Sequence, residues 1–194
     1  MAKIRTFIAI ELSDSVRQKI AELQEELKRD REKISWTKPG NIHLTLKFLG
    51  DTEESKIDRI AGIINGIASD YQSFSLSVSG LGVFPNFRRP RVIWVGMPNS
   101  PASLIEIAEK IDSNLAEIGF PQEDKRFSPH LTIGRVKAEV SNGFIEKIKS
   151  RQFDGGEFNV NEILIMKSDL HPAGAVYTQL QKIALRNQKE GLYE

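Results

Sequence analysis

The chain has 194 residues, of which 40% are hydrophobic and 27% charged, a balance typical of a soluble globular protein and unlike that of a disordered chain. Its formal net charge of +1 gives no overall basic field, so any contact with nucleic acid must come from a local group of cationic side chains. The absence of cysteine excludes a disulfide framework, a thiolate nucleophile and thiolate metal ligands.

The N-terminal segment, residues 4–12, is predicted to be a buried strand. Its uninterrupted apolar run covers only residues 7–10 before Glu11, which is too short for the core of a signal peptide or for a membrane span. We therefore expect a soluble, cytoplasmic protein that does not contact a membrane. The near-zero net charge gives no reason to expect assembly, so a monomer is expected.

Two helices and a second strand are predicted next. Ser13 is a suitable N-cap for the first helix, and Asp51 and Thr52, followed by two glutamates, are predicted to open the second. Between the helices, residues 42–49 are predicted to form another apolar strand. The helical spacing is carried by Val16, Ile20, Leu23 and Leu27 in the first helix and by Ile57, Ile60, Ile64 and Ile67 in the second.

The middle of the chain predicts two strands and a third helix. Phe74, Leu76 and Val78 alternate with serines, which is the pattern of a strand with one buried and one exposed face. Residues 92–95 are predicted to form the next strand. The third helix is predicted to end at Gly119, a suitable C-terminal cap. Its apolar positions are Leu104, Ile107, Ile111, Leu115 and Ile118.

The last part of the chain predicts three strands and one short helix. The strands are expected at residues 130–136, near 158–166 and near 176–185, and the helix near 144–148. The helices are too few for every strand connection to be a parallel crossover, which favours a mixed, mainly antiparallel α+β fold. Because no linker interrupts the sequence, residues 1–194 are predicted to form a single domain.

One short pattern occurs twice on the predicted strands, 87 residues apart. The chain has three histidines, and two of them are followed two places later by a threonine within an aliphatic segment. The two segments read His43-Leu44-Thr45-Leu46 and His130-Leu131-Thr132-Ile133. The offset is nearly half of the chain, as expected after duplication of one ancestral lobe.

Strand geometry gives this spacing a chemical meaning. Side chains alternate between the two faces of a strand, so His43 and Thr45 share one face about 6.5 Å apart while the aliphatic residues point to the other. His130 and Thr132 are related in the same way. Two such strands facing each other would line a cleft with two imidazoles and two hydroxyls that converge on one small anion.

The two histidines also allow non-catalytic interpretations. A single histidine on an apolar strand is more often a hydrogen-bonded core residue than a catalyst, although a matched pair is harder to explain in this way. A zinc site would lack a nearby acidic ligand, an H-E-x-x-H motif and cysteine, so no metal or other cofactor is expected. His171 lacks the threonine, precedes Pro172 and is predicted to be structural, in a turn.

The segments around both motifs resemble the two signatures of the 2H phosphoesterases, in particular the RNA 2′,3′-cyclic phosphodiesterases that are also called 2′-5′ RNA ligases. The similarity extends to the opening segment and to the segment before the third helix, so it runs over most of the chain. The four segments are Arg5-Thr6-Phe7-Ile8-Ala9-Ile10, Trp36-Thr37-Lys38-Pro39-Gly40-Asn41-Ile42-His43-Leu44-Thr45-Leu46-Lys47-Phe48-Leu49-Gly50, Pro90-Arg91-Val92-Ile93-Trp94-Val95 and Phe127-Ser128-Pro129-His130-Leu131-Thr132-Ile133-Gly134-Arg135.

The resemblance implies a bilobal, pseudo-twofold symmetric fold in which two mainly antiparallel sheets face a central cleft, with helices on the outside. It implies hydrolysis of RNA 2′,3′-cyclic phosphate ends to 2′-phosphomonoesters without a metal, with 2′-5′ ligation as the reverse reaction. His43 matches the family's proton donor and His130 its proton acceptor, although the symmetry permits the opposite assignment. Thr45 and Thr132 match its phosphate-binding threonines, and Arg135 matches an arginine often present after the second motif.

Strand alternation also predicts which way the side chains of Arg135 and Phe48 point. Strict alternation would turn Arg135 away from His130, so Arg135 can reach a phosphate only if the strand ends or bulges at Gly134. By the same alternation Phe48 points to the aliphatic face of its strand. We therefore expect Phe48, like Trp36, to lie in the core or in a wall of the cleft.

Residues 84–91 interleave two phenylalanines with three arginines, a composition able to stack bases and bind phosphates. An exposed hairpin loop with solvated charges accounts for the same composition. The expected partners are RNA ends or nucleoside 2′,3′-cyclic phosphates. Two rival functions stay open: a non-catalytic nucleotide-binding module of the same fold, and an enzyme for another substrate such as a 2′-5′ oligonucleotide or a cyclic ADP-ribose phosphate.

Overall fold

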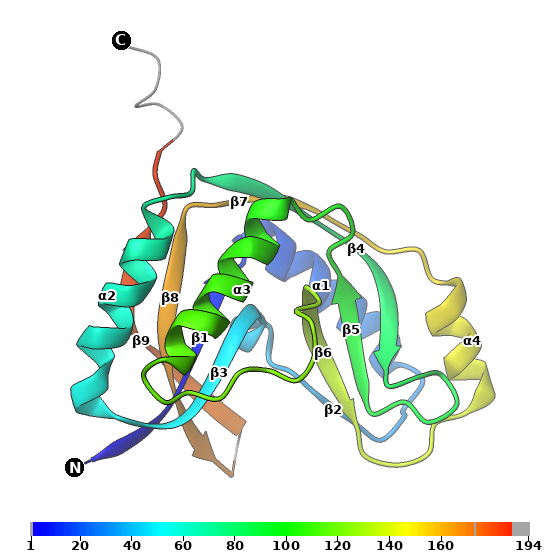
Figure 1. Cartoon of the computed structure of the whole chain (residues 1–194). Helices are drawn as coiled ribbons and strands as arrows, with labels where there is room; N and C mark the ends of the chain where they lie inside the picture. The colour runs from blue at the N-terminus through cyan, green and yellow to red at the C-terminus, as the bar shows by residue number, and fades with distance from the viewer. Residues whose placement is uncertain (1, 173, 188–194) are drawn as a thin grey trace.

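The protein is built from two antiparallel β-sheets, as seen in a computed structural model that describes residues 2–172 and 174–187 (Figure 1). The first sheet has four strands and the second has five. In spatial order the first sheet contains β3 (His43–Glu53), β1 (Lys3–Glu11), β8 (Glu162–His171) and β9 (Gly174–Ala184). The second contains β2 (Ile34–Trp36), β6 (His130–Val136), β5 (Val92–Gly96), β4 (Phe74–Phe84) and β7 (Asp154–Val160).

Four α-helices and two short 3₁₀ turns complete the described part of the chain. The helices are α1 (Asp14–Lys28), α2 (Ile57–Ala68), α3 (Ala102–Ala116) and α4 (Asn142–Ser150), and the 3₁₀ turns are η1 (Pro39–Asn41) and η2 (Glu54–Lys56). Helices α2 and α3 pack against strands of the first sheet, whereas α1 and α4 pack against strands of the second (Figure 1). Each sheet therefore receives one helix from each half of the chain, which gives the molecule a bilobal arrangement.

The helix starts follow from local capping and from apolar spacing. The Ser13 hydroxyl accepts a hydrogen bond from the backbone N–H of Val16, and the Ser141 hydroxyl accepts one from Phe144, so each satisfies a donor that a helix N-terminus leaves open. The predicted apolar positions of α1 and α2 are all buried. Together with buried side chains of both sheets they form one continuous core.

Two predicted element boundaries are wrong, and one short strand was not predicted. The second helix does not begin at Asp51 and Thr52, because β3 continues to Glu53 in register with β1, and the buried Thr52 hydroxyl pairs with that of Thr6. The strand predicted near 158–166 is two strands, β7 and β8, because the chain crosses from the second sheet to the first at Asn161. The short strand β2 was not predicted, since three residues are too few to show a period.

The overall architecture agrees with the prediction of a mixed, mainly antiparallel α+β fold with two sheets. Within the described residues, no helix is both long and apolar enough to cross a membrane.

Candidate active site

The first histidine motif opens strand β3, which forms one edge of its sheet and pairs with β1. Glu11 and Ala9 of β1 lie opposite His43 and Thr45, so all four side chains share one face. Leu44 is fully buried on the other face. His43 and Thr45 are each partly exposed. The alternation predicted from the sequence therefore holds over this motif.

The His43 ring is packed between two aromatic rings. It stacks on Phe7 with 4.6 Å between ring centroids, and it meets the edge of the Tyr177 ring at 5.2 Å. Burial among these groups lowers the pKa of His43 from 6.5 to about 4, and a backbone hydrogen bond at Asn41 opposes part of that change. In the free protein the imidazole is therefore neutral at pH 7.

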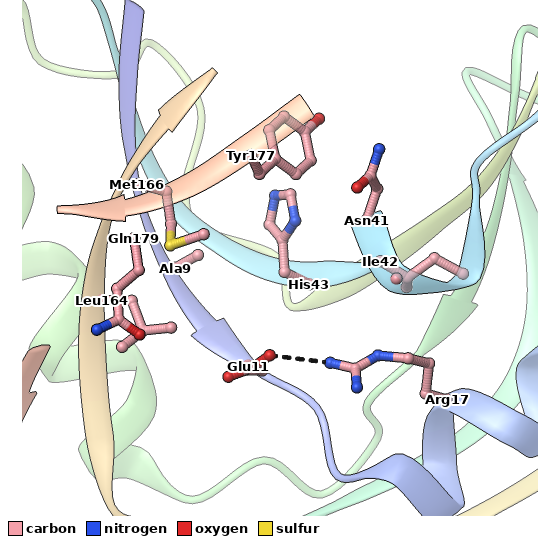
Figure 2. Close-up of a pocket in the computed structure, with 11 residues that line it drawn as sticks. Ala9, Glu11, Arg17, Asn41, Ile42, His43, Leu164, Met166, Tyr177 and Gln179 are labelled. Atoms are coloured by element: carbon pink, nitrogen blue, oxygen red, sulfur yellow. Dashed lines mark hydrogen bonds and ion pairs between the residues drawn. The ribbon is translucent and has the colours of Figure 1, made fainter. Parts of the chain in front are cut away.

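A pocket of about 230 Å³ opens beside His43. Figure 2 shows the imidazole pointing toward Tyr177 of β9, with Asn41 of η1 beside it. On another side of the pocket, Glu11 and Arg17 form an ion pair with 3.1 Å between carboxylate and guanidinium. The remaining lining side chains include Ala9, Ile42, Leu164, Met166 and Gln179. This mixture of polar and apolar groups can hold part of an organic ligand next to the imidazole.

The lowered pKa of His43 predicts a specific pH dependence of stability. The imidazole of His43 takes up a proton near pH 6.5 in the unfolded chain and only near pH 4 in the folded chain. The contribution of His43 to the free energy of unfolding is therefore complete above pH 6.5 and is lost as the pH falls toward 4. Between pH 7 and pH 5 the free energy of unfolding should fall by about 2 kcal/mol more in the wild type than in His43→Gln, as measured by urea denaturation. Parallel pH curves for the two proteins would contradict the burial of this ring.

The second motif opens strand β6 in the other sheet. Gly96 and Trp94 of β5 lie opposite His130 and Thr132, while Leu131 points into the core. The His130 Nδ1 lies 2.7 Å from the carbonyl oxygen of Ser128. A carbonyl can only accept, so Nδ1 carries a proton and Nε2 is the nitrogen left for chemistry.

A β-bulge after the second motif changes the direction of Arg135. Gly134 lies opposite Ile93, but Thr132 lies opposite Trp94, so Ile133 is an extra residue on β6. Ile133 and Gly134 are both buried, and alternation resumes with Arg135 exposed. The bulge on which the predicted role of Arg135 depends is present.

The positive charge of Arg135 acts on Tyr177, a neighbour of His43 in the first motif. Burial raises the pKa of Tyr177, and the nearby charges of Arg135 and Arg5 partly offset that rise. Tyr177 also contacts the His43 ring. Strands β3 and β6, although in different sheets, contact each other (Figure 1). The fold therefore brings the two motif strands together, with Arg135 near the partner ring of His43.

A matching bulge follows the first motif and turns Phe48 to the face of His43 instead of the expected aliphatic face, so of the two predicted positions the core is wrong. Lys47 lies opposite Ile8 and Thr45 opposite Ala9, so Leu46 is the extra residue, and both Leu46 and Lys47 are buried. Phe48 is consequently 58% exposed rather than in the core, with its ring 6.1 Å from that of Phe7. Phe48 and Arg135 both stand five positions after their histidine. The same irregularity thus presents an aromatic ring after one motif and a guanidinium after the other.

Each bulge is connected to the segment that leads into the other motif by one buried polar side chain. Lys47 donates to the carboxylate of Asp112 and, at 2.7 Å, to the carbonyl of Pro121, on the segment before His130. Gln24 of α1 donates at 2.8 Å to two carbonyls, those of Ile133 in the β6 bulge and of Thr37 on the segment before His43. Neither burial was predicted from the sequence, since lysine and glutamine are residue types that are mostly exposed.

The remaining predictions concern His171, Trp36 and metal binding. His171 is exposed at the end of β8, and Trp36 packs against the core in β2. Among residues 2–172 and 174–187, no group of three or more histidine, aspartate or glutamate side chains is arranged to hold a metal ion.

Comparison with known proteins shows one family match in each half of the chain. The family model described as LigT like Phosphoesterase matches the chain twice, over residues 10–94 and 95–177, and each match contains one histidine motif. Two relatives named RNA 2′,3′-cyclic phosphodiesterase come from Methanothermobacter thermautotrophicus and Methanocaldococcus jannaschii. They are 33% and 36% identical to this chain, and the matches cover 94% and 92% of it and 100% and 99% of the relatives.

Solved structures show the same likeness. A protein of Thermus thermophilus superposes with a TM-score of 0.82 at 29% identity, covering 95% of this chain and all of its own. The LigT protein of E. coli, crystallised with 3′-AMP, gives a TM-score of 0.79 at 27% identity and covers 94% of this chain and 98% of its own. The resemblance to the 2H phosphoesterases and their bilobal fold is confirmed. The chain belongs to the LigT-like phosphoesterase family.

Proposed function

We propose that this chain hydrolyses the 2′,3′-cyclic phosphate at RNA ends to a 2′-phosphomonoester, with His43 and His130 as its acid–base pair. The observation that carries the proposal is the contact between two strands of different sheets, each of which opens with a histidine and a threonine on its partly exposed face. The names of the relatives support the reaction class. The 3′-AMP complex of the E. coli relative supports a nucleotide ligand.

Opening the cyclic diester needs a proton removed from water on one side of phosphorus and a proton delivered to the departing ribose 3′-oxygen on the other. His130 acts as the base: its Nδ1–H is held by the Ser128 carbonyl, so the neutral ring offers Nε2 as acceptor. His43 acts as the acid. Its pKa of about 4 in the free protein is too low for this role, but an anionic phosphate beside the ring raises such a pKa by roughly 1–3 units.

The phosphate oxygens are bound by Thr45, Thr132 and Arg135. Each threonine shares a strand face with its histidine, so hydroxyl and imidazole converge on one ligand. Arg135 adds a guanidinium, whose fork of donors matches two phosphate oxygens and offsets charge that develops during the reaction. The reaction needs no metal in this scheme.

The terminal nucleoside binds in the pocket beside His43 and against Phe48. Exposed aromatic rings are suited to base stacking because every base has a flat π face, and stacking does not depend on base identity. We therefore expect little base preference. A 5′-hydroxyl of a second RNA that replaces water as nucleophile would form a 2′-5′ diester, which is the ligation reaction at the same site.

Product analysis on a defined RNA with a terminal 2′,3′-cyclic phosphate tests the proposal. In buffer with a chelator, the protein should convert the end to a 2′-phosphate, which is distinguished from a 3′-phosphate by comparison with the two authentic products. Binding without turnover would identify a non-catalytic nucleotide-binding module. A 3′-phosphate product would mean that the leaving oxygen has been assigned wrongly.

A further inference from the structure

A second hollow lies at the end of β6 that is remote from His130. It is a groove of about 560 Å³ between the loop that joins β4 to β5 and the segment that joins β6 to α4. The loop supplies residues 87–91. Val136 at the end of β6 and residues 137–140 of the segment form the other side, and Asn142 and Ile145 of α4 complete the lining. No part of this groove takes part in the chemistry proposed above.

The groove carries a strong local excess of positive charge. Arg88, Arg89, Arg91 and Lys137 line it, against the single carboxylate of Glu139. All four cations are exposed, and within residues 2–172 and 174–187 none of them forms an ion pair. The whole chain has a net charge of only +1, so this excess is local rather than a consequence of a basic protein.

Hydrogen bonds to backbone groups hold the arginine loop in place. The side-chain oxygen of Asn86 accepts the backbone N–H groups of Arg88 and Arg89 at 3.0 and 3.1 Å. The backbone of Arg91 donates to Phe84 at 2.7 Å and accepts from Val136 at 2.9 Å. The partly buried Phe87 ring packs against the core. The cations therefore project from a supported loop, which lowers the entropy lost when they bind an anion.

Strand β6 connects this groove to the proposed active site. His130 begins the strand and Val136 ends it beside the groove, about 20 Å away at the usual rise per residue. Arg135, with its cationic side chain exposed, stands between them. A polyanion whose terminal phosphate is bound by His130 and Arg135 would reach the groove next along the strand.

We infer that the groove binds backbone phosphates of the RNA whose cyclic end occupies the His43–His130 site, so that the enzyme acts on polymeric RNA in preference to mononucleotides. The inference rests on the proposed function. Guanidinium groups suit phosphates because they bind two oxygens at once, and a single-stranded backbone brings several phosphates within reach of one surface. Such binding releases counterions and weakens as salt increases.

The test compares a nucleoside 2′,3′-cyclic phosphate with an RNA of about 10 nucleotides bearing the same end. The double variant Arg88→Ala/Arg89→Ala should lower kcat/KM on the RNA roughly tenfold, through KM, and leave the mononucleotide reaction unchanged. The slope of log KM against log salt should fall by roughly 0.7 for each lost phosphate contact. The charge-matched control Lys3→Ala/Arg59→Ala, at exposed positions on β1 and α2, should behave as the wild type.

An equal loss on both substrates, or no loss on the RNA, would overturn the inference while leaving the hydrolase intact. If the wild type turns over neither substrate, the proposed function has failed, and the groove is then judged by fluorescence anisotropy with an RNA ending in a 2′-phosphate. Weaker binding by the double variant than by the control supports the groove in that case, and equal binding rejects it. Binding of anionic vesicles instead of RNA would identify a different occupant and overturn the inference.

Discussion

The variant His130→Ala is expected to lose about 10²–10⁴-fold in kcat on an RNA 2′,3′-cyclic phosphate, because one proton-transfer step loses its base. His43→Ala should lose a similar factor. The double variant should lose little more than either single one, since an acid without its base no longer acts as part of a pair. The His130 change should barely affect folding, because the ring is partly exposed and its hydrogen bond is made to the nearby Ser128 carbonyl.

The third histidine provides a matched control. His171→Ala removes an imidazole at the exposed end of β8, and its activity should remain near that of the wild type. Retention of activity within tenfold in either motif variant, measured by single-turnover kinetics, would contradict the acid–base pair. Equal losses in all three variants would point to a general effect on the protein.

A substrate with sulfur at the 3′ bridging position separates the two roles. A thiol has a pKa of about 8.5, so a thiolate can leave without a proton, whereas a ribose alkoxide cannot. The sulfur substrate should therefore restore much of the activity of His43→Ala and little of that of His130→Ala. The reverse pattern would exchange the two assignments, which the pseudo-twofold symmetry of the fold allows.

Sequence periodicity predicted most elements because their apolar positions are buried against one core. Both histidine motifs could be found from the sequence because alternation is regular over His43–Thr45 and over His130–Thr132. The regularity ends one residue later in each strand. A bulge adds one residue to a single strand, and neither local propensity nor period reveals it.

The two bulges had opposite effects on the predictions. Gly134 indicated a possible bulge before Arg135, because glycine inside a strand often marks one. In the structure a Cβ added at Gly134 would meet the Ile34 side chain at 2.9 Å. No glycine marks the bulge at Leu46 and Lys47, so strict alternation turned Phe48 to the aliphatic face of its strand, whereas the ring is exposed on the other face. The buried contacts of Gln24 were equally hidden, since one of them is made to Ile133, 109 residues away.

The largest stability effect outside the apolar core is expected at Lys47. Its ammonium group is buried and hydrogen-bonded to the Asp112 carboxylate and the Pro121 carbonyl, while Asp112 also accepts the backbone N–H of Glu123. Lys47→Met would leave a carboxylate that is only 22% exposed without its cation. The loss of one partner of a buried pair costs about 3–5 kcal/mol, and the partial exposure of Asp112 places the expected loss near the lower end, at about 3 kcal/mol.

The charge left on Asp112 causes this loss, so Lys47→Met/Asp112→Asn should recover part of the stability in urea denaturation. Lys149→Met is the matched control: that lysine pairs with Glu146 at the surface, and its loss should cost less than about 1 kcal/mol. Because Pro121 lies on the segment that leads to His130, the Lys47 variant should also lose kcat under conditions where it is fully folded. A folded Lys47→Met protein with wild-type kcat would mean that the pair stabilises the lobes without aligning the two histidines.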